Sequence, residues 1–207
     1  MDILTRNYFK EIRNGAFAAD EKPEPMSEYK WRVLRKRADD DNVLTFIQKG
    51  AEPHPLNFEE HKQGRRYRNI AKKEYHAIDT SLDSLDLLNI MLYNIDCTMS
   101  GHTSLRGVVE MGRYLRMKGD KVDFVKLETW LRRLGVYNMA RLHGSMLIAL
   151  MGFNLDELPF MHKEMPMAER LGSRDRKLTA AYLRHYPGAT LHSALRRLGR
   201  IVTQIEE

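Results

Sequence analysis

The sequence predicts an all-α protein, a helical bundle of about seven to eight helices, and three observations support this fold class. Apolar residues recur every three or four positions through most of the chain, whereas the strict alternation typical of a β-strand is almost absent. The glycines occur singly, mainly at the ends of these periodic stretches, as in helix C-caps. Aspartate or serine stands just before several stretches, where it can cap a helix N-terminus.

The first 50 residues are predicted to form an N-terminal helical subdomain. A first helix carries its apolar residues at helical spacing and ends at the C-cap signal Asn14-Gly15. Two prolines among acidic residues make residues 18–26 a linker, because proline lacks a backbone N–H. Ser27 then caps a helix over residues 28–38, and after three aspartates a second short helix extends to Gly50.

Residues 51–80 are predicted to be an irregular basic connector. Pro53 and Pro55 exclude regular structure at its start, because each proline fixes its own φ and moves the preceding residue out of the α region. Between His61 and His76 there are six Lys or Arg and one acid, with little hydrophobic periodicity. The sequence therefore indicates a loop or a poorly packed polar helix in this region.

Residues 81–207 are predicted to form a C-terminal helical bundle that completes a single domain over residues 1–207. Its first three helices are expected over residues 85–99, 105–115 and 124–134. The next stretch, residues 137–151, is apolar nearly all round, which predicts the central, buried helix. A capped turn and two further helices follow, over residues 154–160, 174–185 and 190–205.

Composition excludes several classes of protein. Cys97 is the only cysteine, so a disulfide framework and a cysteine-based zinc cluster are excluded, and its place among apolar helix positions indicates a structural thiol. The N-terminus lacks the apolar region of a signal peptide, and the longest apolar run, residues 146–151, is far shorter than the ~20 residues of a membrane helix. We therefore expect a cytoplasmic protein that makes no membrane contact.

No pattern of catalytic or metal-ligating residues stands out, so we expect no catalytic residue, no metal and no cofactor. The histidines lack the i, i+4 pair of a zinc hydrolase. His143 could be a buried base, but a core or rim histidine is the preferred interpretation. Asp83 and Asp86 fit a helix start, where they favour the dipole, and Glu110 is isolated. The single glycines offer no phosphate-binding loop.

Two basic stretches, residues 61–76 and 163–200, are candidate nucleic-acid contacts within a net charge of +6. Lys and Arg bind phosphates electrostatically, with a strong dependence on salt. A helix-turn-helix over residues 123–151 is disfavoured, because its second helix is apolar where base-reading side chains should be. The first stretch supplies the candidate anion or nucleic-acid contacts Lys62, Arg65, Arg66, Arg68, Lys72 and Lys73.

A second candidate surface is rich in methionine. Most methionines fall within predicted helices, where core filling is the expected role. Those beyond the central helix lie in a segment predicted to be irregular, where they could form an exposed patch that contacts a partner protein. The residues of this candidate patch are Phe160, Met161, Met165 and Met167.

Several helix-end motifs occur in a recurring order that resembles a known family. These motifs are Thr103-Ser-Leu-Arg106 through Tyr114-Leu115, Val122-Asp-Phe124, Leu131-Arg-Arg-Leu-Gly135 and Leu150-Met-Gly152 with Leu158-Pro-Phe160. They resemble the helical C-terminal region of an uncharacterised bacterial nucleotidyltransferase-like family. The opening Leu4-Thr-Arg-Asn-Tyr-Phe9, with Glu24-Pro-Met-Ser27 and Trp31, is similar to that family's helical N-terminal segment.

The resemblance implies a relative that lacks the catalytic core. Full-length members of the family carry an α/β core between these two blocks, in which a Gly-Ser pair and an Asp-x-Asp motif hold a triphosphate and two Mg²⁺ ions. Here the interval over residues 51–83 has no Gly-Ser pair, no strand pair and no suitable aspartates. No catalytic residue is therefore carried over to this chain.

The leading functional hypothesis is a non-catalytic helical interaction or regulatory module whose partner is another protein. A first alternative is a nucleic-acid-binding protein that uses residues 61–76 and 163–200. A second is an enzyme of unrecognised type, which would need a cleft where His143, Glu110 or Asp96 converge.

Overall fold

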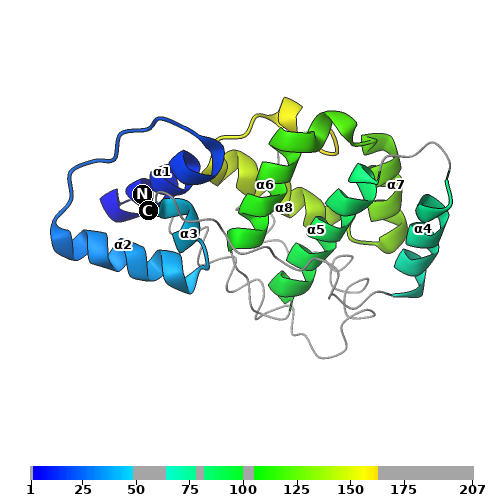
Figure 1. The fold of residues 1–207 in the computed structure, drawn as a ribbon, viewed down its shortest axis with the longest axis horizontal. Coiled ribbons are helices and arrows are strands. Elements are labelled where there is room, and N and C mark those ends of the chain that lie inside the picture. The colour runs from blue at the N-terminus through cyan, green and yellow to red at the C-terminus, as the bar shows by residue number, and fades with distance from the viewer. Residues whose placement is uncertain (1, 49–63, 78–81, 100–104, 163–207) are drawn as a thin grey trace.

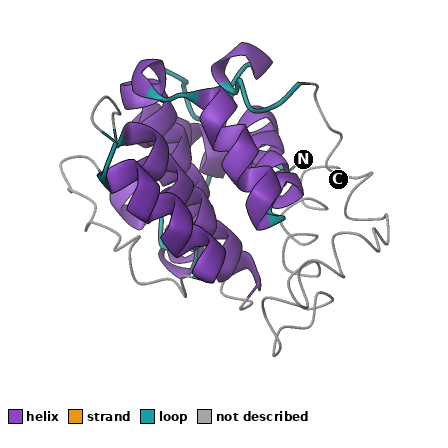
Figure 2. Cartoon of the chain, turned by 90° about the vertical axis from the view of Figure 1, so that its right-hand side faces the viewer, coloured by secondary structure: helices purple, strands orange, loops and turns teal. Residues whose placement is uncertain are grey.

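The computed structural model describes residues 2–48, 64–77, 82–99 and 105–162, and these residues are helical, with no β-strand among them (Figure 2). The predicted all-α bundle is thereby confirmed. The helices over residues 174–185 and 190–205 fall outside the described residues. The elements are α1 Ile3–Phe17, α2 Glu28–Asp40, α3 Leu44–Ile47, α4 Arg65–Tyr75, α5 Asp83–Met99, α6 Leu105–Lys118, the 3-10 turn Gly119–Lys121, α7 Phe124–Leu134, α8 Tyr137–Met151 and the 3-10 turn Leu155–Glu157.

Helices α5 to α8 form the centre of the molecule, and the remaining helices flank it on two sides (Figure 1). Helix α1 packs on α6 and α8, and α2 and α3 in turn pack on α1. Helix α4 packs on α7 at the opposite end of the long axis. As a result, α2 and α4 lie far apart. None of the described helices is long and apolar enough to span a membrane.

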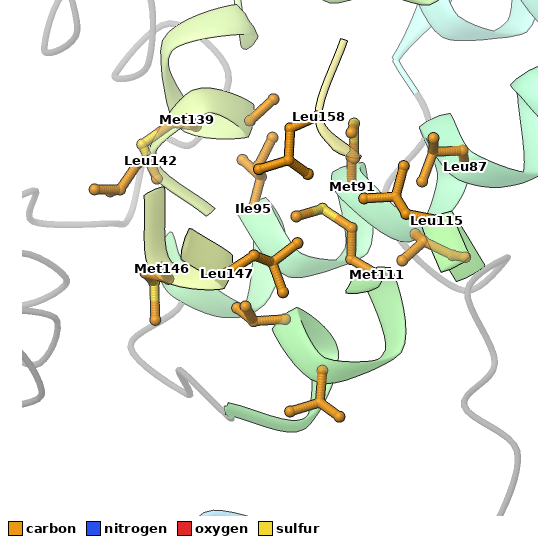
Figure 3. Close-up of a cluster of buried hydrophobic side chains, with 14 of the residues drawn as sticks. Leu87, Met91, Ile95, Met111, Leu115, Met139, Leu142, Met146, Leu147 and Leu158 are labelled. Carbon is orange, nitrogen blue, oxygen red and sulfur yellow. The ribbon is translucent and has the colours of Figure 1, made fainter. Parts of the chain in front are cut away.

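Helix α8 is the central helix, as its all-round apolar pattern predicts. It packs against α1, α5, α6 and α7, and its buried side chains meet those of α5 and α6 in a continuous apolar cluster (Figure 3). Most methionines in the described residues take part in this core. Six of them are buried: Met91, Met111, Met139, Met146, Met151 and Met161.

The predicted ends of α7 have the expected cap geometry. The Asp123 carboxylate accepts a hydrogen bond from the Lys126 backbone N–H at 2.9 Å. At the other end Gly135 adopts the left-handed conformation, with φ of 76°. The Val136 N–H donates to the Leu131 carbonyl at 3.0 Å, which completes a Schellman-type ending.

The prediction that α1 ends at Asn14-Gly15 is wrong. The helix continues to Phe17, and Ala18 provides the left-handed C-cap with φ of 53°. Gly15 instead lies where α3 crosses α1. A Cβ atom at this position would lie 1.5 Å from the backbone carbonyl oxygen of Phe46. Glycine is required here because the two backbones are in direct contact, and the short helix beyond it covers only Leu44–Ile47.

Candidate polyanion-binding face on α4

Residues 65–75 form helix α4, so the prediction of an irregular connector over residues 51–80 is wrong for this part, and of the two alternatives, a loop or a polar helix, the helix is present. Tyr67, Ile70 and Ala71 are buried. Their spacing of three and then one places them on a single helical face, which packs toward α7. The other residues of the predicted connector, 51–63 and 78–80, lie outside the described part of the chain.

Three contacts on the inner face and one edge of α4 fix it to the bundle. The Tyr67 hydroxyl donates to the Asn89 side-chain oxygen on α5. Glu74 accepts an ion pair from Lys126 of α7 at 3.1 Å. The Arg66 guanidinium donates to the Arg133 carbonyl at the C-terminal end of α7, at 3.3 Å. The helix is thus held in a fixed rotation about its axis.

This rotation directs four cations outward, and we call them the cationic face: Arg65, Arg68, Lys72 and Lys73. All four side chains are exposed, and none of them forms an ion pair with another described residue. The single acid of the helix, Glu74, is already neutralised by Lys126. From Arg65 to Lys72 the helix rises by about 10 Å, so the face is a short stripe of positive charge that no described acid compensates.

Five of the six predicted anion contacts therefore lie together on α4. Arg66 lies at the edge of the cationic face, where it is exposed but engaged with the Arg133 carbonyl. Lys62 lies outside the described residues, as does the second basic stretch from residue 163 onward. Tyr75 flanks the cationic face and is 60% exposed, which adds an aromatic ring to the surface.

The predicted partner-contact patch is wrong for the two residues that the structure describes. Phe160 and Met161 are buried, because the chain after Leu158 turns back over α8. A Cβ atom at Gly144 of α8 would lie 2.2 Å from the Met161 sulfur, so the glycine admits this side chain to the core. The Tyr137 hydroxyl also donates to the Phe160 carbonyl at 3.1 Å. Met165 and Met167 lie outside the described residues.

His143 lies within the apolar core. Its side chain is 0% exposed, and its Nε2 lies 3.1 Å from the Thr98 hydroxyl on α5. Burial lowers its pKa to about 4, so the imidazole is neutral near pH 7. It therefore fits the predicted core histidine and is not positioned to meet a substrate from solvent.

The predicted carboxylates serve structural contacts. Glu110 pairs with Arg113 on the same helix at 3.3 Å. Asp83, at the start of α5, accepts from the Tyr114 hydroxyl at 3.0 Å and pairs with Lys118 at 3.2 Å. Across the described residues no three His, Cys, Asp or Glu side chains are grouped so that they could hold a metal ion. Comparisons with family models, curated proteins and solved structures found no match to this chain.

Proposed function

We propose that this chain is a non-catalytic helical binding module, and that the cationic face of α4 contacts an acidic surface on another protein. The observation that carries the proposal is the positive charge of this face, which no acid among the described residues pairs with. Each of the four cations has an exposed head group, while α4 itself is held by contacts on its other side. Such a stripe attracts an acidic partner over roughly a Debye length, which is about 8 Å at physiological salt.

A binding role also agrees with the interior of the bundle. Of the candidate acid and base residues, His143 is buried beside the Thr98 hydroxyl and Glu110 is ion-paired with Arg113. The resemblance of the helical blocks to a nucleotidyltransferase-like family, without its catalytic interval, motivates the same proposal.

Nucleic-acid binding is the second candidate function. It is favoured by Tyr75, which is 60% exposed beside the cationic face. An exposed aromatic ring next to Lys and Arg can stack on an unpaired base while the cations contact phosphates. This combination favours single strands over a duplex, whose bases are already stacked.

Neutralising the cationic face should weaken binding of a polyanion by about tenfold or more. The variant Arg65→Gln/Arg68→Gln/Lys72→Gln removes three adjacent charges without touching the buried face of α4. Fluorescence anisotropy would compare a labelled poly-glutamate peptide, a single-stranded oligonucleotide and a duplex across a range of salt concentrations. For a nucleic acid, the slope of log affinity against log salt should fall by about 2 to 3.

The matched control is Lys30→Gln/Arg32→Gln/Arg35→Gln on α2, which removes three exposed charges at the other end of the molecule. Both variants have the same net charge, so only the location of the lost charges differs. Equal weakening by the two variants would show a net-charge effect and contradict a site on α4. Tighter binding of the single strand than of poly-glutamate would favour the nucleic-acid function.

A further inference from the structure

The segment over residues 18–27, which we call the strap, runs along α1 without regular secondary structure. It links α1 to α2 and is predicted from its prolines to be a linker. The structure shows instead that it is attached to one stripe of α1, at positions i, i+1, i+4, i+7 and i+8 along the helix. The side chains of this α1 stripe are Arg6, Asn7, Lys10, Arg13 and Asn14.

Two asparagines of the α1 stripe pair with the backbone of the strap. The Asn7 side-chain amide donates to the Glu24 carbonyl at 2.7 Å and accepts from the Glu24 N–H at 2.8 Å. Asn14 makes the same two bonds with Glu21, at 2.8 and 2.9 Å. Each amide thus satisfies both backbone groups of one residue, as a neighbouring β-strand would do. Such pairing recognises an extended chain irrespective of its side chains.

Three cations of the α1 stripe bind the two glutamate side chains of the strap. Arg6 binds the Glu24 carboxylate through two nitrogens at 2.9 and 2.7 Å, and Lys10 adds a contact at 3.2 Å. Arg13 binds Glu21 in the same two-pronged manner, at 2.5 and 2.7 Å. The hydrogen bonds from Arg6 and Lys10 hold the pKa of Glu24 to about 2. The α1 stripe therefore favours one carboxylate beside Arg6 and Lys10 and a second beside Arg13.

The spacing of the two asparagines on α1 matches the spacing of the two glutamates in the strap. Asn7 and Asn14 are seven helical residues apart, which corresponds to about 10.5 Å. Glu21 and Glu24 are three residues apart in an extended chain, which corresponds to about 9 to 10 Å. Pro23 between them favours the extended conformation, and it has no N–H that would be left without a partner. A helix face and an extended Glu-x-x-Glu segment therefore match in register.

The strap is less buried than the helix beneath it. Lys22, Pro23 and Pro25 are exposed, and within the strap only Met26, near its end, packs against the core, where it is partly buried. Asn7, by contrast, is 0% exposed beneath the strap. Leu34 and Ala38 anchor α2 in the core independently. Release of strap residues 20–25 would therefore leave these two anchors of α2 in place.

We propose that the α1 stripe is a binding site for an extended acidic segment of another protein, with carboxylates three residues apart, and that the strap occupies this site in cis as a built-in competitor. A tethered segment has an effective concentration of the order of millimolar. A free acidic segment at micromolar concentration therefore binds only when the strap is weakened or displaced. This inference is independent of the proposed role of α4.

The test uses the full chain and a labelled peptide of the strap sequence, Ala19-Asp-Glu-Lys-Pro-Glu-Pro-Met26. In the variant Glu21→Lys/Glu24→Lys the strap is repelled from the α1 stripe, so the peptide should bind with 1:1 stoichiometry and at least about tenfold more tightly than to the wild type. Addition of Arg6→Gln and Asn14→Ala to this variant should abolish binding. A peptide with both Glu residues replaced by Gln should bind at least about tenfold more weakly.

A folded strap variant that fails to bind the peptide, or binds the Gln peptide equally well, overturns the proposal. If the strap variant does not fold, the wild type is titrated with millimolar peptide instead. The side-chain amide NMR signals of Asn7 and Asn14 should then shift, and signals that stay in place overturn the proposal. Concentration-dependent dimers of the wild type without peptide binding would assign the site to a second copy of this chain, and would also overturn it.

Discussion

Replacing Gly15 with alanine is expected to destabilise the fold by about 3 kcal/mol, although alanine is the better helix former. A Cβ atom at this position would lie 1.5 Å from the Phe46 carbonyl oxygen and 2.6 Å from its carbon. Both are backbone atoms, which cannot move aside as a flexible side chain can. Helix α3 must therefore shift away from α1, and the buried Phe46 side chain with it. Urea unfolding of the wild type and the variant measures the difference.

The matched control is Gly119→Ala, at the turn between α6 and α7, where an added Cβ would meet no other atom within 4 Å. We expect its stability to remain within about 0.5 kcal/mol of the wild type. If Gly15→Ala were as stable as this control, the close crossing of α1 and α3 would be wrong. The comparison separates the close contact from the general preference of helices for alanine.

Helices with long aliphatic faces and glycine ends were predictable from the sequence. For α7 and α8 the periodicity of leucine and methionine locates the buried face, and Asp123 and Gly135 mark the two ends of α7. The apolar periodicity and the capping residues indicate the same helix boundaries, so the two sequence signals agree. The central position of α8 follows from apolar residues on all its faces.

The sequence did not decide between a loop and a polar helix at α4, because the inner face of this helix is made of side chains that indicate burial only weakly. Ala71 is common in any environment, and Tyr67 is buried because its hydroxyl reaches Asn89 on α5. This partner is distant in sequence, so no local pattern reveals it. The cations of α4 were predicted as a group, but their common direction depends on the rotation of the helix, which is fixed by its contacts with α5 and α7.

The sequence did not reveal the α1 stripe or the true role of Gly15, and the reason is the same in both cases. Each depends on a segment that returns against α1, the strap in one case and α3 in the other. Local signals identified the proline-containing linker, but they misassigned the Asn-Gly pair as the end of α1. They could not show that Asn14 pairs with Glu21, because a hydrogen bond between a helix and a returning chain has no periodicity of its own.

Acidification from pH 7 to pH 4 is expected to remove about 3 kcal/mol of folding free energy through His143 alone. Burial lowers the pKa of its imidazole from 6.5 to about 4 in the folded protein. Below pH 6.5 the unfolded chain takes up a proton that the folded chain excludes. The stabilisation is therefore complete above pH 6.5 and is lost as the pH falls toward 4. Urea unfolding at half-unit steps of pH measures this decline.

The physical reason is that protonation would place a charge in the core. His143 Nδ1 has no hydrogen-bond partner among the described residues, and Nε2 meets only the Thr98 hydroxyl. The pKa of Glu21 is lowered by hydrogen bonds from Arg13, and that of Glu157 is lowered by Arg116 against the opposing effect of burial. Their contributions to stability are lost only below about pH 4.5. Among the described residues, His143 is therefore the group with a shifted pKa whose contribution changes between pH 6.5 and 4.5. His143→Gln should flatten stability in this window, with His76→Gln at an exposed position as the matched control. If the stability of His143→Gln declined equally over this pH range, other groups would cause the decline, because glutamine does not titrate.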